Sequence, residues 1–321
     1  MPFPGGSSGQ MFKSAQARYA AYAAERCGYA FRSLDGEDGY LFEVRDGARV
    51  AAFATGAGTP YALNDARAAS LARDKAFCAE VLRAVGVPVV PGRVFFVTKR
   101  WVEMRSPGRE PEDAQVFAEG ATYPLFCKPI SASSGQYAEV VSGPAHFADY
   151  VARVAQDHFA ILVQPYIRAA AEYRVFVMNG QALFSYRKTA PRVVGDGEST
   201  LRTLIERQGA GSASLAGQDL DAIVPRGESR SLAGAANRAR GGGSDLFRDG
   251  APAPLAALAL AAAKAIDLQL AGVDIFDVRG DQTELMVIEV NSNPMIATLE
   301  DHNRWDLIER IWRANFDAAL R

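Results

Sequence analysis

The chain is poor in the side chains that build zinc and disulfide sites. Its 321 residues include three cysteines and three histidines, and none stands at a spacing typical of metal ligands. Scattered cysteines are typical of reduced thiols in a cytoplasmic protein, so we expect neither a disulfide framework nor a Cys–His nucleophile. These residues are Cys27, Cys78, Cys127, His146, His158 and His302.

The sequence also lacks a strong charge of either sign and any long apolar run. Its formal net charge is −2, from 35 basic and 37 acidic residues that are interspersed along the chain. This balance argues against nucleic acid or an anionic membrane surface as a partner. No apolar run approaches the roughly 18 residues that span a bilayer. Residues 1–10, rich in Gly and Ser, are expected to be a disordered lead-in.

Two common nucleotide fingerprints are missing, because neither G-x-x-x-x-G-K-[ST] nor G-x-G-x-x-G occurs in the chain. The 49% hydrophobic content is nevertheless enough for a sizeable core. The order of hairpins and helices predicts an α+β fold with antiparallel sheets backed by helices. Helices are predicted over residues 11–26, 65–85, 144–157, 254–270 and 304–320, with a loop-rich segment at 207–250. Strands are predicted at 29–32, 40–44, 49–54, 94–97, 123–128, 137–141, 160–164, 173–178 and 182–187.

Two strand-like runs near the C-terminus carry oxygen ligands. Asp274 lies in Ala271–Val278, and Glu289 and Asn291 lie in Glu284–Pro294. Side chains two apart on a strand share a face, so Glu289 and Asn291 project together, and Asp274 joins them if the runs pair as a hairpin. Two carboxylates and an amide oxygen suit Mg²⁺. The alternative interpretation is an edge hairpin with solvated acids.

A lysine and a loop of small residues occupy Tyr123–Val141. Lys128 ends a strand, and Ser131–Gly135 form a loop whose backbone N–H groups can approach phosphates closely. Such a loop is also flexible enough to act as a lid. The alternative is an ordinary hairpin with a flexible tip.

Further polar residues follow in Ala160–Val177. Gln164 precedes a proline, and the backbone of this hinge suits an adenine edge. Glu172 is placed to accept from ribose hydroxyls, and Arg174 to contact phosphates. For each residue alone, two strands with a polar connection explain the pattern equally well.

Basic residues gather in two later segments. Arg187 and Lys188 lead into a Gly-Asp-Gly turn, and a second group surrounds Asn237. A cluster of arginines suits carboxylates or acyl phosphates, although a solvated basic loop is the alternative. The arginines of the second group are Arg226, Arg230, Arg238 and Arg240.

The order of these segments resembles the ATP-grasp superfamily of carboxylate–amine ligases over residues 60–300. The family includes D-alanine–D-alanine ligase, glutathione synthetase and ribosomal-protein glutamate ligase. The ATP-grasp domain of cyanophycin synthetase and of bifunctional glutathione synthetase is the nearest likeness. The segments that carry it are Asp74-Lys75, Lys128-Pro129, VQPYI, EYR, VVGDGEST, VPRGESRSL, ANRARGGG, GVDI and VIEVNSNP.

The resemblance implies an ATP-grasp fold, in which two antiparallel-sheet α+β subdomains clasp ATP behind a small N-terminal domain. Its boundaries here are 11–89 for the N-terminal domain, 90–165 for the small subdomain or lid, and 166–321 for the large subdomain. It also implies an ADP-forming C–N ligase that makes a peptide-type bond through an acyl phosphate. The expected substrates are ATP, a carboxylate and an amine from an amino acid or small peptide.

The resemblance assigns nucleotide and metal roles residue by residue. Asp274, Glu289 and Asn291 match ligands of two Mg²⁺ ions, for which Mn²⁺ is a substitute. The nucleotide residues are Lys75, Lys128, Ser133, Ser134, Gly135, Gln164, Tyr166, Ile167 and Glu172. The family has glutamate where this chain has Gln164, so the adenine contact relies more on backbone.

The remaining matches concern the reacting groups. Lys188 matches a basic residue near the γ-phosphate, although Arg187 fills that position in a shifted register. Arg174 adds charge at the phosphates, Asn237 matches an active-site asparagine, and Arg238 or Arg240 is expected to stabilise an oxyanion. The sequence identifies neither the substrates nor a general base.

Three other functions remain open at this point. They are a small-molecule kinase, a ligase that makes an ester or amide within a peptide, and a non-catalytic ATP-binding module. The oligomeric state is open too, because the apolar stripe on the C-terminal helix suits either the core or a homodimer face. Core packing is the favoured interpretation of this stripe, which consists of Trp305, Ile308, Ile311, Trp312 and Phe316.

Overall fold

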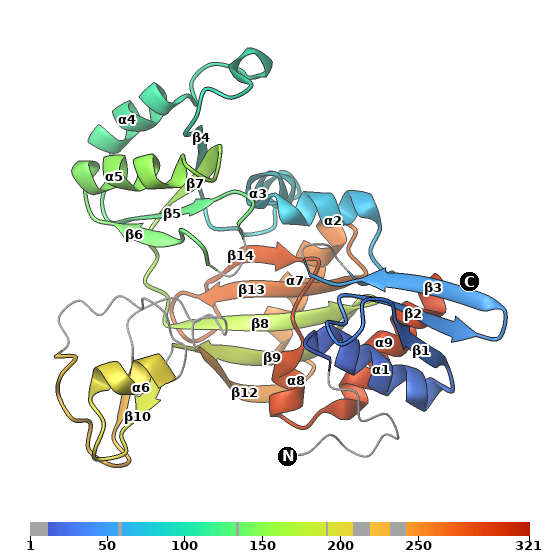
Figure 1. The fold of residues 1–321 in the computed structure, drawn as a ribbon. Helices are drawn as coiled ribbons and strands as arrows, with labels where there is room; N and C mark the ends of the chain where they lie inside the picture. The colour runs from blue at the N-terminus through green and yellow to red at the C-terminus, as the bar shows by residue number, and fades with distance from the viewer. Residues whose placement is uncertain (1–11, 57–59, 133–134, 191, 208–218, 232–241) are drawn as a thin grey trace.

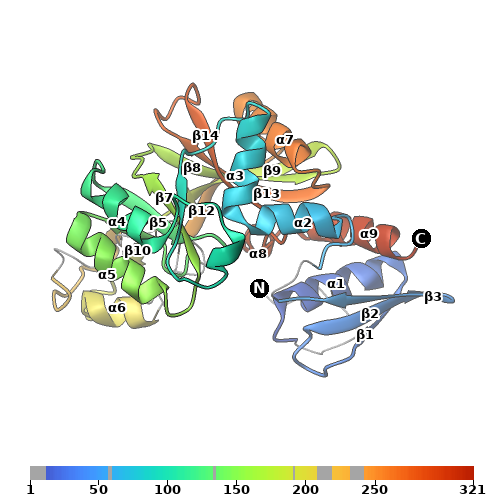
Figure 2. The ribbon, with the colours of Figure 1, turned by 90° about the horizontal axis from the view of Figure 1, so that it is seen from above.

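The protein is represented by a computed structural model that describes residues 12–56, 60–132, 135–190, 192–207, 219–231 and 242–321. The lead-in expected at residues 1–10 lies outside this part of the chain. The described strands form a five-stranded sheet, a four-stranded sheet, a three-stranded N-terminal sheet and a further strand pair. Figure 1 and Figure 2 show the four-stranded sheet at one end of the five-stranded sheet and the N-terminal sheet at the other. All strand pairs within the described sheets are antiparallel. The predicted α+β class is confirmed.

The five-stranded sheet, called the large sheet, has the strand order β12-β9-β8-β13-β14. Asn179 and Gly180, both with positive φ, form the tight turn between β8 and β9 that two-residue hairpins favour. The buried Asp277 carboxylate accepts from the Gly280 and Gln282 backbone N–H groups and so holds the β13–β14 turn. The predicted C-terminal hairpin is therefore confirmed. The strands are β8 Ala171–Met178, β9 Gln181–Thr189, β12 Gly243–Asp249, β13 Leu270–Asp277 and β14 Leu285–Asn291.

Three helices pack on one face of the large sheet: α2 (Ala66–Arg73), α3 (Lys75–Ala84) and α7 (Ala253–Ala265). The prediction of one helix over 65–85 was wrong. Asp74 has an extended backbone, and its carboxylate accepts from the Ala76 and Phe77 N–H groups, so it ends α2 and caps α3. The break matters because it places Lys75 in the first turn of α3.

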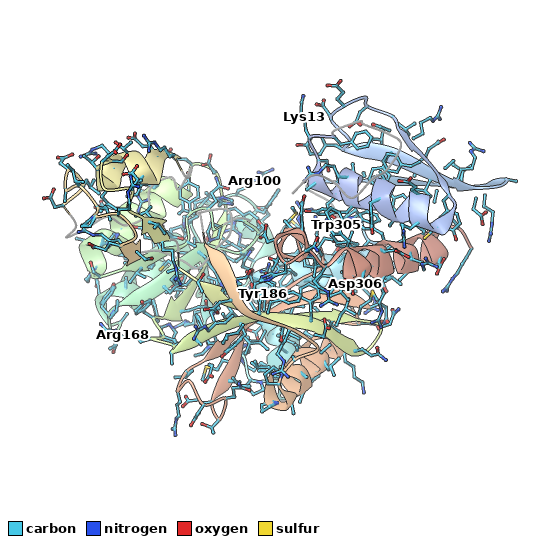
Figure 3. The ribbon with its side chains drawn as sticks, turned by 90° about the horizontal axis from the view of Figure 1, so that it is seen from below. Lys13, Arg100, Arg168, Tyr186, Trp305 and Asp306 are labelled. Atoms are coloured by element: carbon cyan, nitrogen blue, oxygen red, sulfur yellow. The ribbon has the colours of Figure 1, made fainter. Side chains whose placement is uncertain are left out.

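The N-terminal unit packs on the C-terminal helices. Its sheet and α1 share one core with α9 and part of the large sheet, in which Trp312 and Phe316 are fully buried. Trp305, the first residue of α9, faces α1 (Figure 3), and its ring contacts the rings of Tyr19 and Tyr22. The core-facing interpretation of the C-terminal stripe is confirmed. The elements are α1 Ala15–Cys27, β1 Ala30–Ser33, β2 Leu41–Asp46, β3 Arg49–Ala54, α8 Ala297–Asp301 and α9 Trp305–Ala319.

The four-stranded sheet, called the small sheet, has the order β4-β7-β5-β6 and packs against α4 and α5 around Phe95 and Phe147. Its connection to the rest is fixed, because Val90 N donates to Val287 O and Val287 N donates to Pro88 O at the edge of the large sheet. The elements are β4 Arg93–Phe96, a short 3-10 turn Val102–Met104, α4 Pro111–Glu119, β5 Leu125–Pro129, β6 Glu139–Val141, α5 Pro144–Val154 and β7 Ala160–Pro165.

A small satellite joins β10 (Arg192–Val194), β11 (Ser229–Ser231) and α6 (Leu201–Arg207), whose first turn is capped by Thr200. The prediction of a loop-rich 207–250 missed β11 and β12, whose short polar strands lack alternation. The helix predicted to reach residue 270 ends at Ala265, since Leu270 already pairs in β13. Helix α4 was not predicted. Among the described residues, no helix combines the length and apolar character needed to cross a membrane.

Candidate active site

Asp274, in the middle of β13, is the most enclosed acid of the candidate site, with 1% of its surface exposed. Arg174 donates from Nε to Oδ1 at 2.7 Å and from Nη2 to Oδ2 at 2.6 Å, and Lys188 Nζ lies 2.8 Å from Oδ2. Asp274 stands opposite Arg174 in the β13–β8 ladder, and cross-strand partners share a face. Burial opposes the charged carboxylate, yet the two cations hold the pKa of Asp274 well below its usual range.

Lys188 joins a second carboxylate to the first. Its Nζ lies 2.5 Å from Glu172 Oε1, and the two residues are partners in the β8–β9 ladder. Burial disfavours the charged lysine, but Asp274 and Glu172 together raise the pKa of Lys188 above its ordinary value. Burial raises the pKa of Glu172. We call Glu172, Arg174, Lys188 and Asp274 the charged cluster.

Glu289 and Asn291 continue this face onto the edge strand β14. Glu289 is opposite Asp274 and Asn291 is opposite Gly272 in the β13–β14 ladder. Asn291 Nδ2 donates to Glu289 Oε1 and to Gly272 O, each at 3.3 Å, so its amide oxygen is the atom suited to a cation. A side chain on Gly272 would lie 2.8 Å from Pro294 Cβ. The glycine therefore lets the chain after β14 fold closely over the face. The predicted meeting of Asp274, Glu289 and Asn291 occurs.

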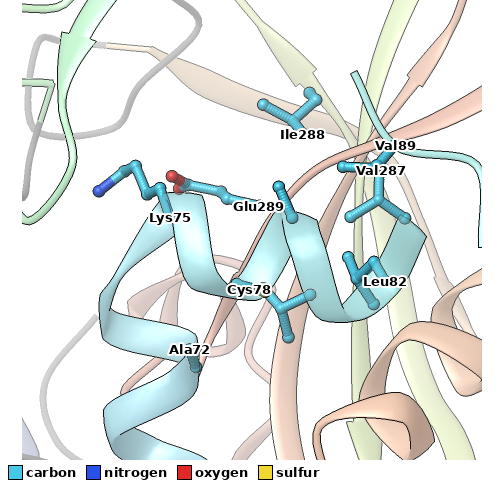
Figure 4. A pocket seen from close by; sticks show the side chains of 10 residues that line it. Ala72, Lys75, Cys78, Leu82, Val89, Val287, Ile288 and Glu289 are labelled. Carbon is cyan, nitrogen blue, oxygen red and sulfur yellow. The ribbon is translucent and has the colours of Figure 1, made fainter. Parts of the chain in front are cut away.

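Lys75 reaches the same place from the first turn of α3. Its Nζ donates to Ala132 O at 2.6 Å, and its backbone N–H donates to Ile130 O. Lys75 and Glu289 line one small pocket between α3 and β14, and their charged ends lie at its mouth (Figure 4). Helix α3 thus joins the loop after β5 to the edge of the large sheet.

Lys128 approaches from the small sheet. It ends β5, it is 6% exposed, and in the described part of the chain no carboxylate lies within salt-bridge distance of it. Burial lowers the pKa of Lys128, while Glu289 and Asp274 act in the opposite direction. Lys128 therefore faces the carboxylates of the large sheet across the junction of the two sheets.

The three residues predicted to contact adenine lie where the chain leaves the small sheet. Gln164 is buried, and its Nε2 donates to Val90 O at 3.2 Å. Gly92 packs against it, since a Cβ there would lie 3.0 Å from Gln164 Cγ. Tyr166 is 41% exposed and donates its backbone N–H to Pro124 O, and Ile167 is half-buried. The Gln164 side chain thus stabilises the segment that leads into β4, through its hydrogen bond to Val90 O.

Comparisons with known proteins agree with this arrangement. Residues 239–314 match the model of the RimK-like ATP-grasp domain. A bifunctional glutathione synthetase from Pasteurella multocida superimposes with a TM-score of 0.54 at 19% identity, over 94% of this chain and 43% of that chain. The D-alanine–D-alanine ligase of Bacillus anthracis gives a TM-score of 0.52 at 15% identity, over 79% of this chain and 69% of that chain.

Sequence similarity points the same way. Cyanophycin synthetase of Geminocystis herdmanii is 24% identical over 253 residues, which are 70% of this chain and 28% of that protein. The chain therefore has an ATP-grasp fold, and its residues 239–314 are similar to the RimK-like ATP-grasp domain. It spans less than a third of the length of that curated relative.

Some of the residues that the ATP-grasp resemblance singled out lie outside the described residues. They are Ser133, Ser134, Asn237, Arg238 and Arg240. Gly135 is described and has a φ of 72°, a left-handed conformation that favours glycine where the loop turns back toward β6. Of the other arginines near Asn237, Arg226 donates to Asp196 O and Arg230 to Glu228.

Two features of β9 in this ATP-grasp domain were not settled or not seen in the sequence. Arg187 lies on the opposite face from the charged cluster and makes a two-pronged pair with Asp245 at 2.9 and 2.7 Å. Lys188 is therefore the basic residue that enters the site. Tyr186 is 7% exposed and stands opposite Arg174, near the centre of the large sheet (Figure 3). Its spacing of two from Lys188 was the signal for the shared face.

The arrangement as a whole has the charge needed for a polyanion. The site contains four cationic side chains and three carboxylates, so it carries one positive charge in excess. The cations are Lys75, Lys128, Arg174 and Lys188, and the carboxylates are Glu172, Asp274 and Glu289. The cations come from both sheets and from α3, so an anion between them would contact all three elements. This is a suitable environment for a phosphate chain with its metal ions.

Proposed function

We propose that the protein is an ATP-dependent ligase that joins a carboxylate to an amine, forming an amide through an acyl phosphate. The observation that carries the proposal is the meeting of Asp274, Glu289 and Asn291 with Lys188 and Lys128 at the junction of two sheets. Its similarity to ligases and synthetases supports the same class of reaction. The carboxylate and the amine are taken to come from amino acids or small peptides.

In this proposal ATP lies between residues 90–165, which act as the lid, and residues 166–321. Residues 11–89 contribute Lys75 from α3. Lys75 and Lys128 bind the phosphates from one side, and the Ser131–Gly135 loop closes over them and keeps water from the intermediate. Adenine lies along the hinge of Gln164, Tyr166 and Ile167, with Glu172 at the ribose.

The donor set at the large sheet suits Mg²⁺. Asp274 and Glu289 supply carboxylate oxygens and Asn291 an amide oxygen, the hard ligands this ion prefers. The described residues contain no group of three or more His, Cys, Asp or Glu arranged to hold a metal. With these three residues as ligands, the remaining oxygens around a divalent ion would come from phosphates and water. When bound there, Mg²⁺ would neutralise charge that develops on the phosphate oxygens.

The chain's own residues prepare the transfer in two ways. Arg174 holds Asp274 in place through two hydrogen bonds, so the carboxylate would bind a metal ion without first having to reorient. Lys188, already charged and within reach of Asp274 and Glu172, is positioned to contact the γ-phosphate when the substrate carboxylate attacks it. Lys128 then carries the charge at the leaving ADP.

The test is ADP release from Mg·ATP with amino acids and dipeptides, supplied singly and in pairs, with products measured by mass. We expect ADP only when a carboxylate and an amine are both present, and a product lighter than their sum by one water. A phosphorylated alcohol formed without an amine would overturn the proposal in favour of a kinase. ATP binding without turnover in any pool would favour a binding module.

The variant that tests the metal site is Glu289→Gln, which keeps the size of the side chain and removes its charge. We expect ADP release to fall by about three orders of magnitude, because metal and oxyanion contacts of this kind contribute that much. Mg·ATP turnover that survives this change would contradict the assignment of the metal site.

A further inference from the structure

A histidine on the large-sheet side of the site has a hydroxyl partner. His302, at the end of α8, has its Nε2 3.1 Å from Ser244 Oγ on β12, and its ring stacks on Phe247 with centroids 4.5 Å apart. Both His302 and Ser244 are half-buried. The imidazole is therefore fixed from two directions, by a hydrogen bond and by a ring.

The position of Ser244 connects this pair to the charged cluster. Ser244 is the partner of Lys188 in the β12–β9 ladder, so the two side chains lie on the same face of adjacent strands. Across the strands, His302 neighbours Ser244, Ser244 neighbours Lys188, and Lys188 neighbours Glu172. The Ser244–His302 pair thus borders the place where Lys188 would meet the phosphoryl group.

The backbone that carries His302 is held firmly. Its N–H donates to Thr298 O, and the neighbouring Glu300 accepts from Tyr19 Oη at 2.5 Å and from Arg18 at 3.3 Å. The two contacts to Glu300 come from α1 of the N-terminal unit. The unit therefore braces α8 against the large sheet and keeps His302 beside β12.

Amide formation needs a group that takes a proton from the amine, and the carboxylates of the site are engaged elsewhere. Asp274 and Glu172 hold cations, and Glu289 accepts from Asn291. We propose that Ser244 and His302 form the proton-accepting pair for the amine substrate, which binds beside them. This inference rests on the proposed ligase function.

The amine nitrogen forms a bond to the acyl carbon, the bond between that carbon and the phosphate oxygen breaks, and its electron pair leaves with inorganic phosphate. The proton lost by the nitrogen passes to Ser244 Oγ, while the Ser244 hydroxyl proton moves to His302 Nε2. The imidazole then returns its proton to solvent.

Hydroxylamine separates this step from the one before it. Hydroxylamine is uncharged near neutral pH, whereas an α-amino group is an ammonium ion that must lose a proton before it attacks. Hydroxamate formation therefore reports the acyl phosphate without the need for that proton acceptor. The experiment measures hydroxamate and amide formation by wild type, His302→Gln and Ser244→Ala, with Mg·ATP and pooled amino acids as carboxylates and amines.

We expect both variants to lose about 100-fold or more in amide formation, with hydroxamate formation kept close to the wild-type rate. His146→Gln is the matched control, because His146 pairs with Glu139 on the small-sheet unit, and both of its rates should stay unchanged. Equal loss of both products in His302→Gln, with Ser244→Ala behaving alike, would indicate a structural role and overturn the inference.

Amide formation that survives in both variants would also overturn it. A wild-type protein that makes no hydroxamate with any carboxylate would instead overturn the ligase proposal, and this inference with it. The two failures are therefore distinguishable by hydroxamate formation in the wild type.

Discussion

The large sheet and the small sheet each bring a lysine to the site, Lys188 from one and Lys128 from the other. Lys188 touches two carboxylates, and they raise its pKa despite burial. Lys128 is the more enclosed of the two, burial lowers its pKa, and the carboxylates that oppose this effect lie beyond salt-bridge distance in the described part of the chain. Charge is balanced within the charged cluster of the large sheet, whereas Lys128 of the small sheet has no carboxylate within salt-bridge distance among the described residues.

This difference indicates what each sheet contributes. A network whose charges are already paired is organised before the ligand arrives, and it favours accurate placement of metal and phosphate. A buried lysine that lies beyond salt-bridge distance of a carboxylate costs folding free energy, and binding a phosphate offsets that cost. In the proposed ligase, the large sheet therefore positions the reaction and the small sheet supplies affinity for the nucleotide.

The largest effect is expected from Asp274→Asn, which removes the centre of the large-sheet network. Arg174 and Lys188 would then be buried without their shared carboxylate, which typically costs about 3–5 kcal/mol of folding stability. ADP release should also fall by about three orders of magnitude. Urea unfolding and the ADP assay measure the two effects. If the urea concentration at the midpoint of unfolding were the same in the variant and the wild type, the network would not be organised before the ligand binds.

A smaller effect, with the opposite sign for stability, is expected from Lys128→Met. The methionine fills a similar volume without a charge, so the free energy of unfolding should rise, whereas Mg·ATP turnover should fall by about 100-fold. Urea unfolding and turnover on the same preparation test both parts. A loss of stability would mean that Lys128 already has a favourable partner in the free protein.

The same comparison predicts a pH dependence. Because the pKa of Lys128 is lowered in the folded state, its cost to stability is full below that pKa and disappears as pH rises to the ordinary value of 10.5. The stability advantage of Lys128→Met should therefore shrink toward pH 10.5. Lys188 behaves oppositely, since its raised pKa gives stability that is lost as pH rises above 10.5. Unfolding curves across alkaline pH, with Lys188→Met as the matched variant, separate the two.

How far the sequence predicted this site depends on the type of contact. The period of two along strands placed Glu289 beside Asn291, and the hairpin through residues 279–281 brought Asp274 to them, because register follows from the turn. The Ser244–His302 contact was beyond the sequence. It joins residues 58 apart in the chain, one of them in β12 within a segment predicted to be loop.

The break at Asp74 shows a second limit. Periodicity ran through residues 65–85 without interruption, and an aspartate inside a helix is only mildly unfavourable, so propensity gave no stop signal. The capping hydrogen bonds of Asp74 became visible only in the structure. Similarly, the choice between Arg187 and Lys188 needed the sheet itself, since it depends on which side chains of β9 lie on the same face as Glu172 and Asp274.

The smallest effect is expected from Arg187→Gln, which tests that choice. Arg187 and its partner Asp245 are both more than a third exposed, so losing their pair should cost about 0.2–1 kcal/mol. Turnover should remain near the wild-type rate, because the side chain lies on the opposite face from the charged cluster. The adjacent change Lys188→Gln should reduce turnover by about 100-fold on the same strand. If turnover fell in Arg187→Gln and stayed near the wild-type rate in Lys188→Gln, Arg187 would be the residue that contacts phosphate. The charged cluster of the large sheet would then not be organised for the ligand before it binds.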